Sequence, residues 1–247
     1  MTVRASRSPG DVDDRWVLGA WERGQFADPV NRAVILLAAA AGCSDEDAER
    51  VELGARDAFL GAELFRLAGA VVWSWVPCSG CGETLDVPVD LGALPRGAGA
   101  DTGRPGVTVE TPDGRLAVRL PDSRDLRAVA DDSDGVVAGR RMLLRRLLLD
   151  PPTNQEITEE TAEIIEAALE EASPGAAVSV TVACPGCDAD TDAVLDVPLL
   201  LWCHVEAAAT ALMSEIHALA SAYGWTETDV LGLPPSRRRG YLALVRR

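Results

Sequence analysis

The stretch VVWSWVPCSGCGETLDVP, residues 71–88, recurs in related form as VSVTVACPGCDADTDAVLDVP, residues 178–198. In the first copy Val72, Ser74 and Val76 alternate with Trp73 and Trp75, and in the second Val178, Val180 and Val182 alternate with other residues. Both runs lead into a Cys-x-x-Cys turn, and this is the period-two pattern of a β-strand. Leu-Asp-Val-Pro follows each turn, so we expect a second strand to return beside the first. The second copy is four residues longer between its last cysteine and this tetrapeptide, which a longer hairpin would absorb. The repeat therefore predicts two similar β-hairpins, each with a cysteine pair at its tip.

The cysteines of the repeat are predicted to hold one structural zinc ion; they are Cys78, Cys81, Cys184 and Cys187. Zinc prefers a tetrahedral set of thiolates, and a Cys-x-x-Cys turn brings two sulfurs to one ion while backbone amides brace them. The two pairs are 184 − 81 = 103 positions apart, whereas short zinc motifs usually separate them by ~15–20 residues. We therefore expect an insertion between the hairpins whose ends, Leu91 and Ala176, return to the same side.

Two other interpretations of the cysteines stay open, namely two idle reduced pairs or two local redox pairs. A redox Cys-x-x-Cys normally opens a helix, where the helix dipole lowers the thiol pKa. Both pairs here are predicted to lie between strands, and neither alternative explains the repeat. Cys43 and Cys203 are expected to be small buried apolar groups.

The fold class expected is α+β, with helical N- and C-terminal parts around a small zinc-ribbon-like β centre. Helices are predicted from Asp28-Pro29 to Gly42, from Ser44 onward, and over 55–67. A hairpin around Pro112-Asp113-Gly114 is followed by helix signals capped by Ser123 and continuing over 136–149, and then by an acidic helix over 157–172. The predicted division is a flexible tail at 1–14, a helical part at 15–70, the β centre at 71–91 and 176–198, an insertion at 92–175 that opens with an exposed Gly-rich loop, and C-terminal helices at 199–247.

Composition narrows the classes of function. The chain has 247 residues and a formal charge of −16, with 39 acidic and 23 basic residues, every one of the latter an arginine. Such a charge repels phosphate backbones and anionic lipids, which disfavours generic nucleic-acid or membrane binding. The longest apolar run, Ala33 to Gly42, is shorter than the ~18–20 residues of a membrane span, and the N-terminus lacks an apolar signal region. We therefore expect a soluble cytoplasmic protein.

No motif indicates an enzyme. His204-Val205-Glu206 and Pro77-Cys78-Ser79-Gly80-Cys81 match pieces of the zinc deaminase signature, but their order along the chain is reversed. His204 and His217 are too far apart for a helical metal pair and are interpreted as ordinary helix residues.

The C-terminal segment combines aromatic and leucine residues with an arginine cluster. Thr226 and Asp229 form a capping box, and Pro235 opens a final helix, so two short helices meet at a sharp turn. This composition is typical of an interface anchor with a charged rim. The candidate partner-binding residues are Tyr223, Trp225, Leu231, Arg237, Arg238, Arg239 and Tyr241. Docking of the aromatic residues on the protein's own body is the competing interpretation.

Several of these segments together resemble the T-even phage family of baseplate hub assembly chaperones, in the form found in contractile injection system and phage-like gene clusters. The segments are Gly54-Ala55-Arg56-Asp57, the two Cys-x-x-Cys turns, Val118-Arg119-Leu120-Pro121-Asp122-Ser123-Arg124-Asp125-Leu126, Leu199-Leu200-Leu201-Trp202, Ala222-Tyr223-Gly224-Trp225 and Pro235-Ser236-Arg237-Arg238-Arg239. The resemblance implies a non-enzymatic role in which the protein binds a baseplate hub or spike subunit before the tube grows. The alternative from another class is a zinc-stabilised nucleic-acid-binding regulator that uses the helix-turn-helix-like C-terminal segment.

Overall fold

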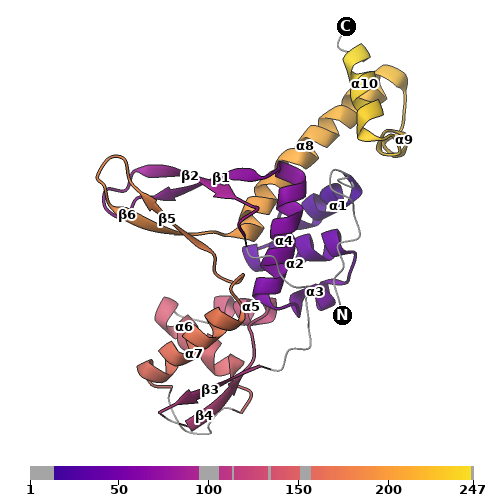
Figure 1. Cartoon of the computed structure of the whole chain (residues 1–247). Coiled ribbons are helices and arrows are strands. Elements are labelled where there is room, and N and C mark those ends of the chain that lie inside the picture. The colour runs from indigo at the N-terminus through magenta and orange to yellow at the C-terminus, as the bar shows by residue number, and fades with distance from the viewer. Residues whose placement is uncertain (1–13, 95–105, 113, 133–134, 151–156, 246–247) are drawn as a thin grey trace.

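The computed structural model describes residues 14–94, 106–112, 114–132, 135–150 and 157–245. Most of the predicted N-terminal tail, most of the Gly-rich loop and the central residue of the 112–114 turn lie outside these ranges. The described chain is a mixture of helices and small antiparallel sheets, which confirms the α+β class at this level. Figure 1 shows three parts that project from a helical core: an arm of four strands, a lobe built from the insertion, and a C-terminal unit.

The helical core consists of α1 (Asp14–Gly24), α2 (Pro29–Ala41), α3 (Asp45–Glu49) and α4 (Leu53–Ala68), packed on the first half of α8 (Val197–Tyr223). The predicted start of α2 is confirmed, because the Asp28 side chain accepts hydrogen bonds from Val30 N and Asn31 N, 3.0 Å each. Its end is also confirmed, since Gly42 takes the left-handed conformation with φ 69°. The fully buried leucines Leu36, Leu37, Leu60, Leu64 and Leu201 fill the space between these helices.

Helix α8 is not a continuous apolar run, because His204 and Glu206 interrupt it, so the sequence pattern does not predict a membrane span there. Among the described helices it is the one long and apolar enough to cross a membrane, judged by length and composition. This is a weak indication, because a core helix of a soluble protein meets the same criterion. Leu201, Trp202 and Val205 are buried in the helical core.

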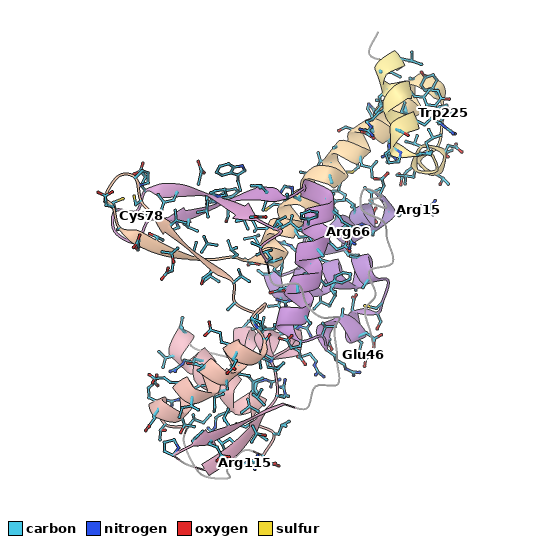
Figure 2. The ribbon with its side chains drawn as sticks, viewed as in Figure 1. Arg15, Glu46, Arg66, Cys78, Arg115 and Trp225 are labelled. Carbon is cyan, nitrogen blue, oxygen red and sulfur yellow. The ribbon has the colours of Figure 1, made fainter. Side chains whose placement is uncertain are left out.

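The arm, here called the cysteine arm, consists of two antiparallel hairpins. Strands β1 (Val71–Pro77) and β2 (Thr84–Asp90) form one sheet, and β5 (Ser179–Ala183) and β6 (Asp190–Val194) form the other. The side chains of Val72, Val87, Val180 and Val182 join the apolar cluster between the arm and the core. Figure 2 places Cys78 at the far end of the arm.

The second copy of Leu-Asp-Val-Pro does not repeat the structure of the first. Leu85 to Pro88 lies inside strand β2, whereas Asp196 caps helix α8 and Pro198 occupies its first turn. The expected longer second hairpin is wrong, because six residues separate the strands in both hairpins, 78–83 and 184–189. The additional residues instead form most of β6, so the second tetrapeptide begins only after that strand ends. Proline fits equally well at the edge of a two-stranded sheet and at the start of a helix.

The insertion lobe contains β3 (Val107–Thr111), β4 (Gly114–Val118), α5 (Ser123–Asp132), α6 (Val136–Leu147) and α7 (Glu159–Ala172). Its own small core includes Val118, Leu144, Leu147 and Ile165. The predicted continuous helical stretch over 123–149 is wrong, because α5 and α6 are separate helices and Gly135 precedes α6 with φ 95°. Both ends of the insertion meet α4: Leu94 packs beside Gly61, and Gly175 lies against the backbone of Gly54.

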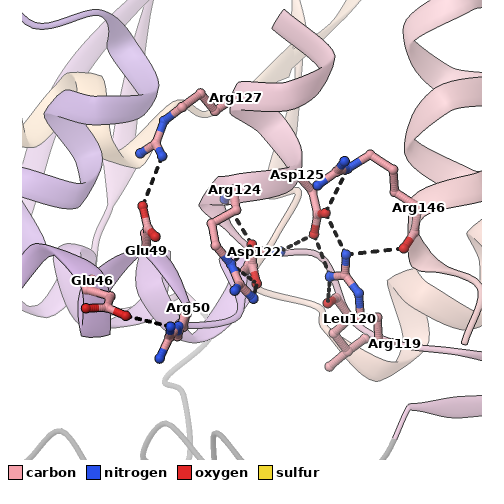
Figure 3. Close-up of polar contacts among 10 residues, drawn as sticks. All are labelled: Glu46, Glu49, Arg50, Arg119, Leu120, Asp122, Arg124, Asp125, Arg127 and Arg146. Atoms are coloured by element: carbon pink, nitrogen blue, oxygen red, sulfur yellow. Dashed lines mark hydrogen bonds and ion pairs between the residues drawn. The ribbon is translucent and has the colours of Figure 1, made fainter. Parts of the chain in front are cut away.

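A network of ion pairs and hydrogen bonds lies at the start of α5, where the lobe meets the core (Figure 3). Asp125, which is fully buried, accepts two hydrogen bonds of 2.6 Å from Arg119 and one of 3.2 Å from Arg146. Asp122, rather than the predicted Ser123, caps the helix, since its carboxylate accepts from Arg124 N at 2.9 Å. Ser123 is buried and accepts a hydrogen bond of 3.0 Å from Arg56.

Further hydrogen bonds connect the lobe to the helical core near this network. Arg127 of α5 donates to Glu49 at 2.9 Å and to Asn31 at 2.7 Å, and Leu53 N donates to Pro121 O at 3.0 Å. Because these bonds reach α2, α3 and the start of α4, the lobe is fixed on the core by several groups rather than by one.

The C-terminal unit comprises the second half of α8 with α9 (Glu227–Leu231) and α10 (Pro235–Val245). The predicted capping box is confirmed, because Thr226 and Asp229 exchange side-chain and backbone hydrogen bonds. Leu219, Val230 and Leu242 form a small core that is separate from the central one. Arg238 ties the unit to α1 through an ion pair of 2.7 Å with Asp14.

Candidate metal centre

Four cysteine sulfurs meet at the tip of the cysteine arm. The Sγ atoms of Cys78, Cys81, Cys184 and Cys187 all lie within 4.8 Å of one another. Cys78 Sγ is 3.6 Å from Cys187 Sγ, and Cys81 Sγ is 3.7 Å from Cys184 Sγ. A tetrahedral ion with metal–sulfur bonds of about 2.3 Å would set sulfur–sulfur distances of about 3.8 Å. The predicted convergence of the two pairs is therefore confirmed, and their spacing fits a single metal ion.

The two turns are built by the same hydrogen bonds. Cys78 N donates to Glu83 O at 2.8 Å, and Cys184 N donates to Ala189 O at 2.9 Å. In each turn the residue four positions after the first cysteine has a left-handed backbone, Gly82 with φ 76° and Asp188 with φ 58°. Aspartate is among the few residues besides glycine that tolerate this conformation, so the second turn keeps the geometry of the first.

Direct contacts hold the two turns together. Ser79 N donates a hydrogen bond of 3.0 Å to Thr191 Oγ1, and the Ser79 hydroxyl donates one of 3.2 Å to Asp190 O. Gly80 is required by the close approach, because a Cβ at this position would lie 2.8 Å from Ala189 Cβ and 3.2 Å from Cys187 Sγ. The sulfur cluster is therefore positioned by a polar interface as well as by the strands.

The four thiols differ in burial, and the pKa values of Cys78 and Cys187 are shifted in opposite directions. Cys78 and Cys184 are buried, whereas Cys81 and Cys187 are exposed. The backbone N–H groups of Cys81 and Gly80 lower the pKa of the Cys78 thiol to about 6. The Ala189 N–H favours the thiolate of Cys187, but the neighbouring sulfurs of Cys78 and Cys81 outweigh it and raise that pKa to about 12. Since crowded thiolates repel one another, a bound cation is what would allow all four to lose their protons.

The other cysteines and the histidines do not join this cluster. All six cysteines are free thiols. The expectation that Cys203 is buried is wrong, because its position on α8 turns it toward solvent, while Cys43 is half-buried. His204 is half-buried and His217 is exposed on α8.

The predicted partner-binding residues divide into outward-facing and inward-facing groups. Arg237 and Arg239 are exposed, but Arg238 is 4% exposed and forms ion pairs with Asp14 and Glu215, 2.7 Å each. Arg238 is therefore an internal residue, which corrects its assignment to a charged rim. Tyr223, Trp225 and Tyr241 pack on one another, with ring centroids 4.8–5.7 Å apart, and Leu231 is half-buried.

No protein-family model, curated protein or solved structure matches this chain. The site is therefore interpreted from its own geometry.

Replacement of residues 95–103 by a glycine-serine linker of equal length should leave the metal content unchanged. The contacts that assemble the sulfur cluster come from 78–83 and 184–191, and Leu94, which packs beside Gly61, is retained. Elemental analysis and thermal unfolding of the variant and of the wild-type chain provide the measurement. The free energies of unfolding of the two chains should agree within about 0.5 kcal/mol. Loss of metal from this variant would contradict the inference that the cysteine arm assembles the sulfur cluster without residues 95–103.

Proposed function

We propose that Cys78, Cys81, Cys184 and Cys187 hold one structural zinc ion and that the cysteine arm is a zinc-ribbon-like module. The donor set supports this assignment, because four thiolates in a tetrahedral arrangement are characteristic of structural zinc sites. With four protein ligands the coordination shell is full, so the ion would brace the arm rather than bind a substrate. When bound, zinc would cross-link two hairpins whose tips are otherwise joined by the hydrogen bonds of Ser79 and by close packing at Gly80.

We further propose that the protein is a non-enzymatic assembly factor for the baseplate hub of a phage-tail-like contractile injection system. It would bind a hub or spike subunit in the cytoplasm. One observation carries this proposal: two of the segments on which the family resemblance rests, 54–57 and 118–126, contact each other. Arg56 donates to Ser123 at 3.0 Å and pairs with Asp57 at 2.6 Å. Because both segments serve the same joint, a shared architecture would account for both resemblances, and this supports the proposal.

The C-terminal unit is the proposed contact surface for that subunit. It projects away from the core on the second half of α8 (Figure 1). Its exposed groups include Arg237, Arg239 and the edge of Tyr223, which is 40% exposed. Two short helices, of which α10 carries the arginines, also suit a nucleic-acid-binding regulator. However, the inward position of Arg238 and the acidic first turn of α9 weaken that alternative.

Replacement of both Arg237 and Arg239 by glutamate should weaken capture of the hub or spike subunit at least about tenfold, because like charges would then oppose a surface that favours arginine. The measurement is a quantitative pull-down with tagged full-length protein and with hub and spike subunits of a phage-tail-like contractile injection system. The matched control is the pair Arg141→Glu and Arg145→Glu on α6. These two arginines are also exposed, and their replacement should leave capture unchanged.

Three outcomes would reject the proposal or change it. Failure of the wild-type chain to bind any hub or spike subunit would reject the assembly role. Loss of capture only in the α6 variant would move the contact surface to the insertion lobe. Tight binding of duplex DNA at physiological salt, falling steeply as salt rises, would favour the regulator.

A further inference from the structure

The outer face of the β1–β2 sheet carries an exposed row of large apolar side chains. Val71, Trp73 and Trp75 alternate along β1 and are 52%, 60% and 66% exposed, whereas their neighbour Val72 is 3% exposed. The inner face of the sheet, with Leu85, Val87 and Val89 from β2, is buried. The tryptophans therefore belong to the face that the fold leaves uncovered by the described residues.

Carboxylates from β2 lie beside these indoles. The strand register places Asp86 opposite Trp75, Pro88 opposite Trp73 and Asp90 opposite Val71. Both aspartates are exposed, and directly opposed side chains in a sheet are close enough to act on one ligand. We call these six residues, Val71, Trp73, Trp75, Asp86, Pro88 and Asp90, the aromatic-acidic face.

The charge of this face selects its ligand. Asp90 accepts a hydrogen bond of 2.8 Å from Gly92 N, while Asp86 has no polar partner among the described residues, and neither β1 nor β2 contains an arginine. Indole rings attract cations through their π-electrons, and the adjacent carboxylates strengthen that attraction. The chain uses the same pairing internally, where the Arg32 guanidinium lies 4.5 Å from the centroid of the Trp202 ring. Phosphate groups would be repelled, which argues against stacking of nucleic-acid bases.

We propose that the aromatic-acidic face binds a basic segment of a partner protein whose arginine or lysine side chains stack on Trp73 and Trp75 and pair with Asp86. Exposed tryptophan is a typical anchor of protein interfaces, and a net charge of −16 favours the approach of a basic partner. This surface lies on the arm and not on the C-terminal unit. The proposal is therefore independent of the hub-binding role.

Binding of defined peptides to the full-length protein tests the proposal. The probe is a short dye-labelled peptide in which arginine alternates with valine, and the reference probe has glutamine in place of each arginine. Fluorescence anisotropy at low and high salt measures affinity. The wild-type chain should bind the arginine peptide at least about tenfold more tightly than the glutamine peptide at low salt, with the difference shrinking as salt rises.

Matched variants distinguish binding to the aromatic-acidic face from attraction by the overall negative charge of the protein. The double variant Trp73→Thr, Trp75→Thr should lose about tenfold in affinity through two exposed cation–π contacts. Asp86→Asn should lose about threefold, as expected for an exposed ion pair. Phe26→Ser removes an aromatic side chain that is 96% exposed elsewhere, and Glu22→Gln removes an exposed carboxylate of α1. Both should bind like wild type.

Other results would overturn the proposal. Equal affinity for the arginine and glutamine peptides would show that charge does not select the ligand. Unchanged binding by the double tryptophan variant would show that the basic peptide binds elsewhere on an acidic protein. Sedimentation that shows a wild-type dimer and a monomeric double variant would assign the face to a second copy of this chain. Metal content and circular dichroism equal to wild type confirm that each variant is folded.

Discussion

Serine in place of Cys184 should abolish stoichiometric metal binding and unfold the tip of the cysteine arm while the helical core stays folded. This result is expected because an isolated two-stranded hairpin is at best marginally stable in water. The tip has only a small apolar cluster around Cys78, Leu85 and Cys184. Zinc held by four thiolates supplies about 10 kcal/mol or more of apparent binding energy to small domains, so loss of the proposed ion should remove a large part of what holds the two tips together.

The measurement combines elemental analysis with hydrogen exchange. Wild-type protein should contain about one zinc ion per chain, and the Cys184→Ser variant should lose amide protection over 76–85 and 182–191. The base of the arm should keep its protection, because Val72 and Val89 belong to the core cluster. Cys203→Ser is the matched control, since that thiol is exposed on α8 and outside the cluster. Full protection of the tip in metal-free wild-type protein, or two ions per chain, would reject the single structural site.

Asparagine at position 125 should lower the free energy of unfolding by about 3 kcal/mol, as removal of one member of a buried ion pair typically does. Asp125 is fully buried and accepts hydrogen bonds from Arg119, Arg146 and the backbone of Asp122. An amide group can neither neutralise two guanidinium groups nor accept all of these bonds. Urea unfolding of both chains at neutral pH provides the measurement. Asp131→Asn, on the exposed surface of the same helix, should change stability by less than about 0.5 kcal/mol.

The same carboxylate should make stability depend on pH in the acid range. Burial alone would raise the pKa of Asp125, but the hydrogen bonds and charge of Arg119, with help from Arg146, lower it overall. A lowered pKa in the folded state means that the contribution is complete above the unfolded value of about 3.9 and is lost as pH falls through the folded value. The stability difference between wild type and Asp125→Asn should therefore narrow below about pH 4. A constant difference down to pH 2 would contradict an ionised Asp125.

The sequence predicted the parts of the fold whose signals are local. Asp28 before Pro29, Gly42 at a helix end and the box formed by Thr226 and Asp229 each act within one turn of helix. The sulfur cluster was also predictable, because the duplicated Cys-x-x-Cys turns encode two hairpins of the same shape. The break between α5 and α6 was not, since the leucines and arginines of 136–149 continue a helical pattern and Gly135 interrupts it only through its backbone conformation.

Properties that depend on tertiary packing could not be predicted in this way. Arg238 belongs to a run of three arginines, and only the position of α10 against Asp14 and Glu215 distinguishes it from its neighbours. Trp73 and Trp75 follow the alternation of a strand, but alternation does not say which face of a strand will be covered. Asp125 looks like any acidic residue near a helix start until Arg119 and Arg146 are brought beside it.

The separation of the two cysteine turns along the chain also determines the order in which the molecule can assemble. The first turn is complete at Cys81, but its partner follows only after 184 − 81 = 103 further positions. During synthesis on the ribosome the first two thiols must therefore wait while the whole insertion lobe emerges. Closure of so long a loop is entropically demanding, and contacts between distant residues slow folding. A lobe already folded on α4 would shorten the effective distance between the turns, so capture of the proposed ion would follow the folding of the lobe.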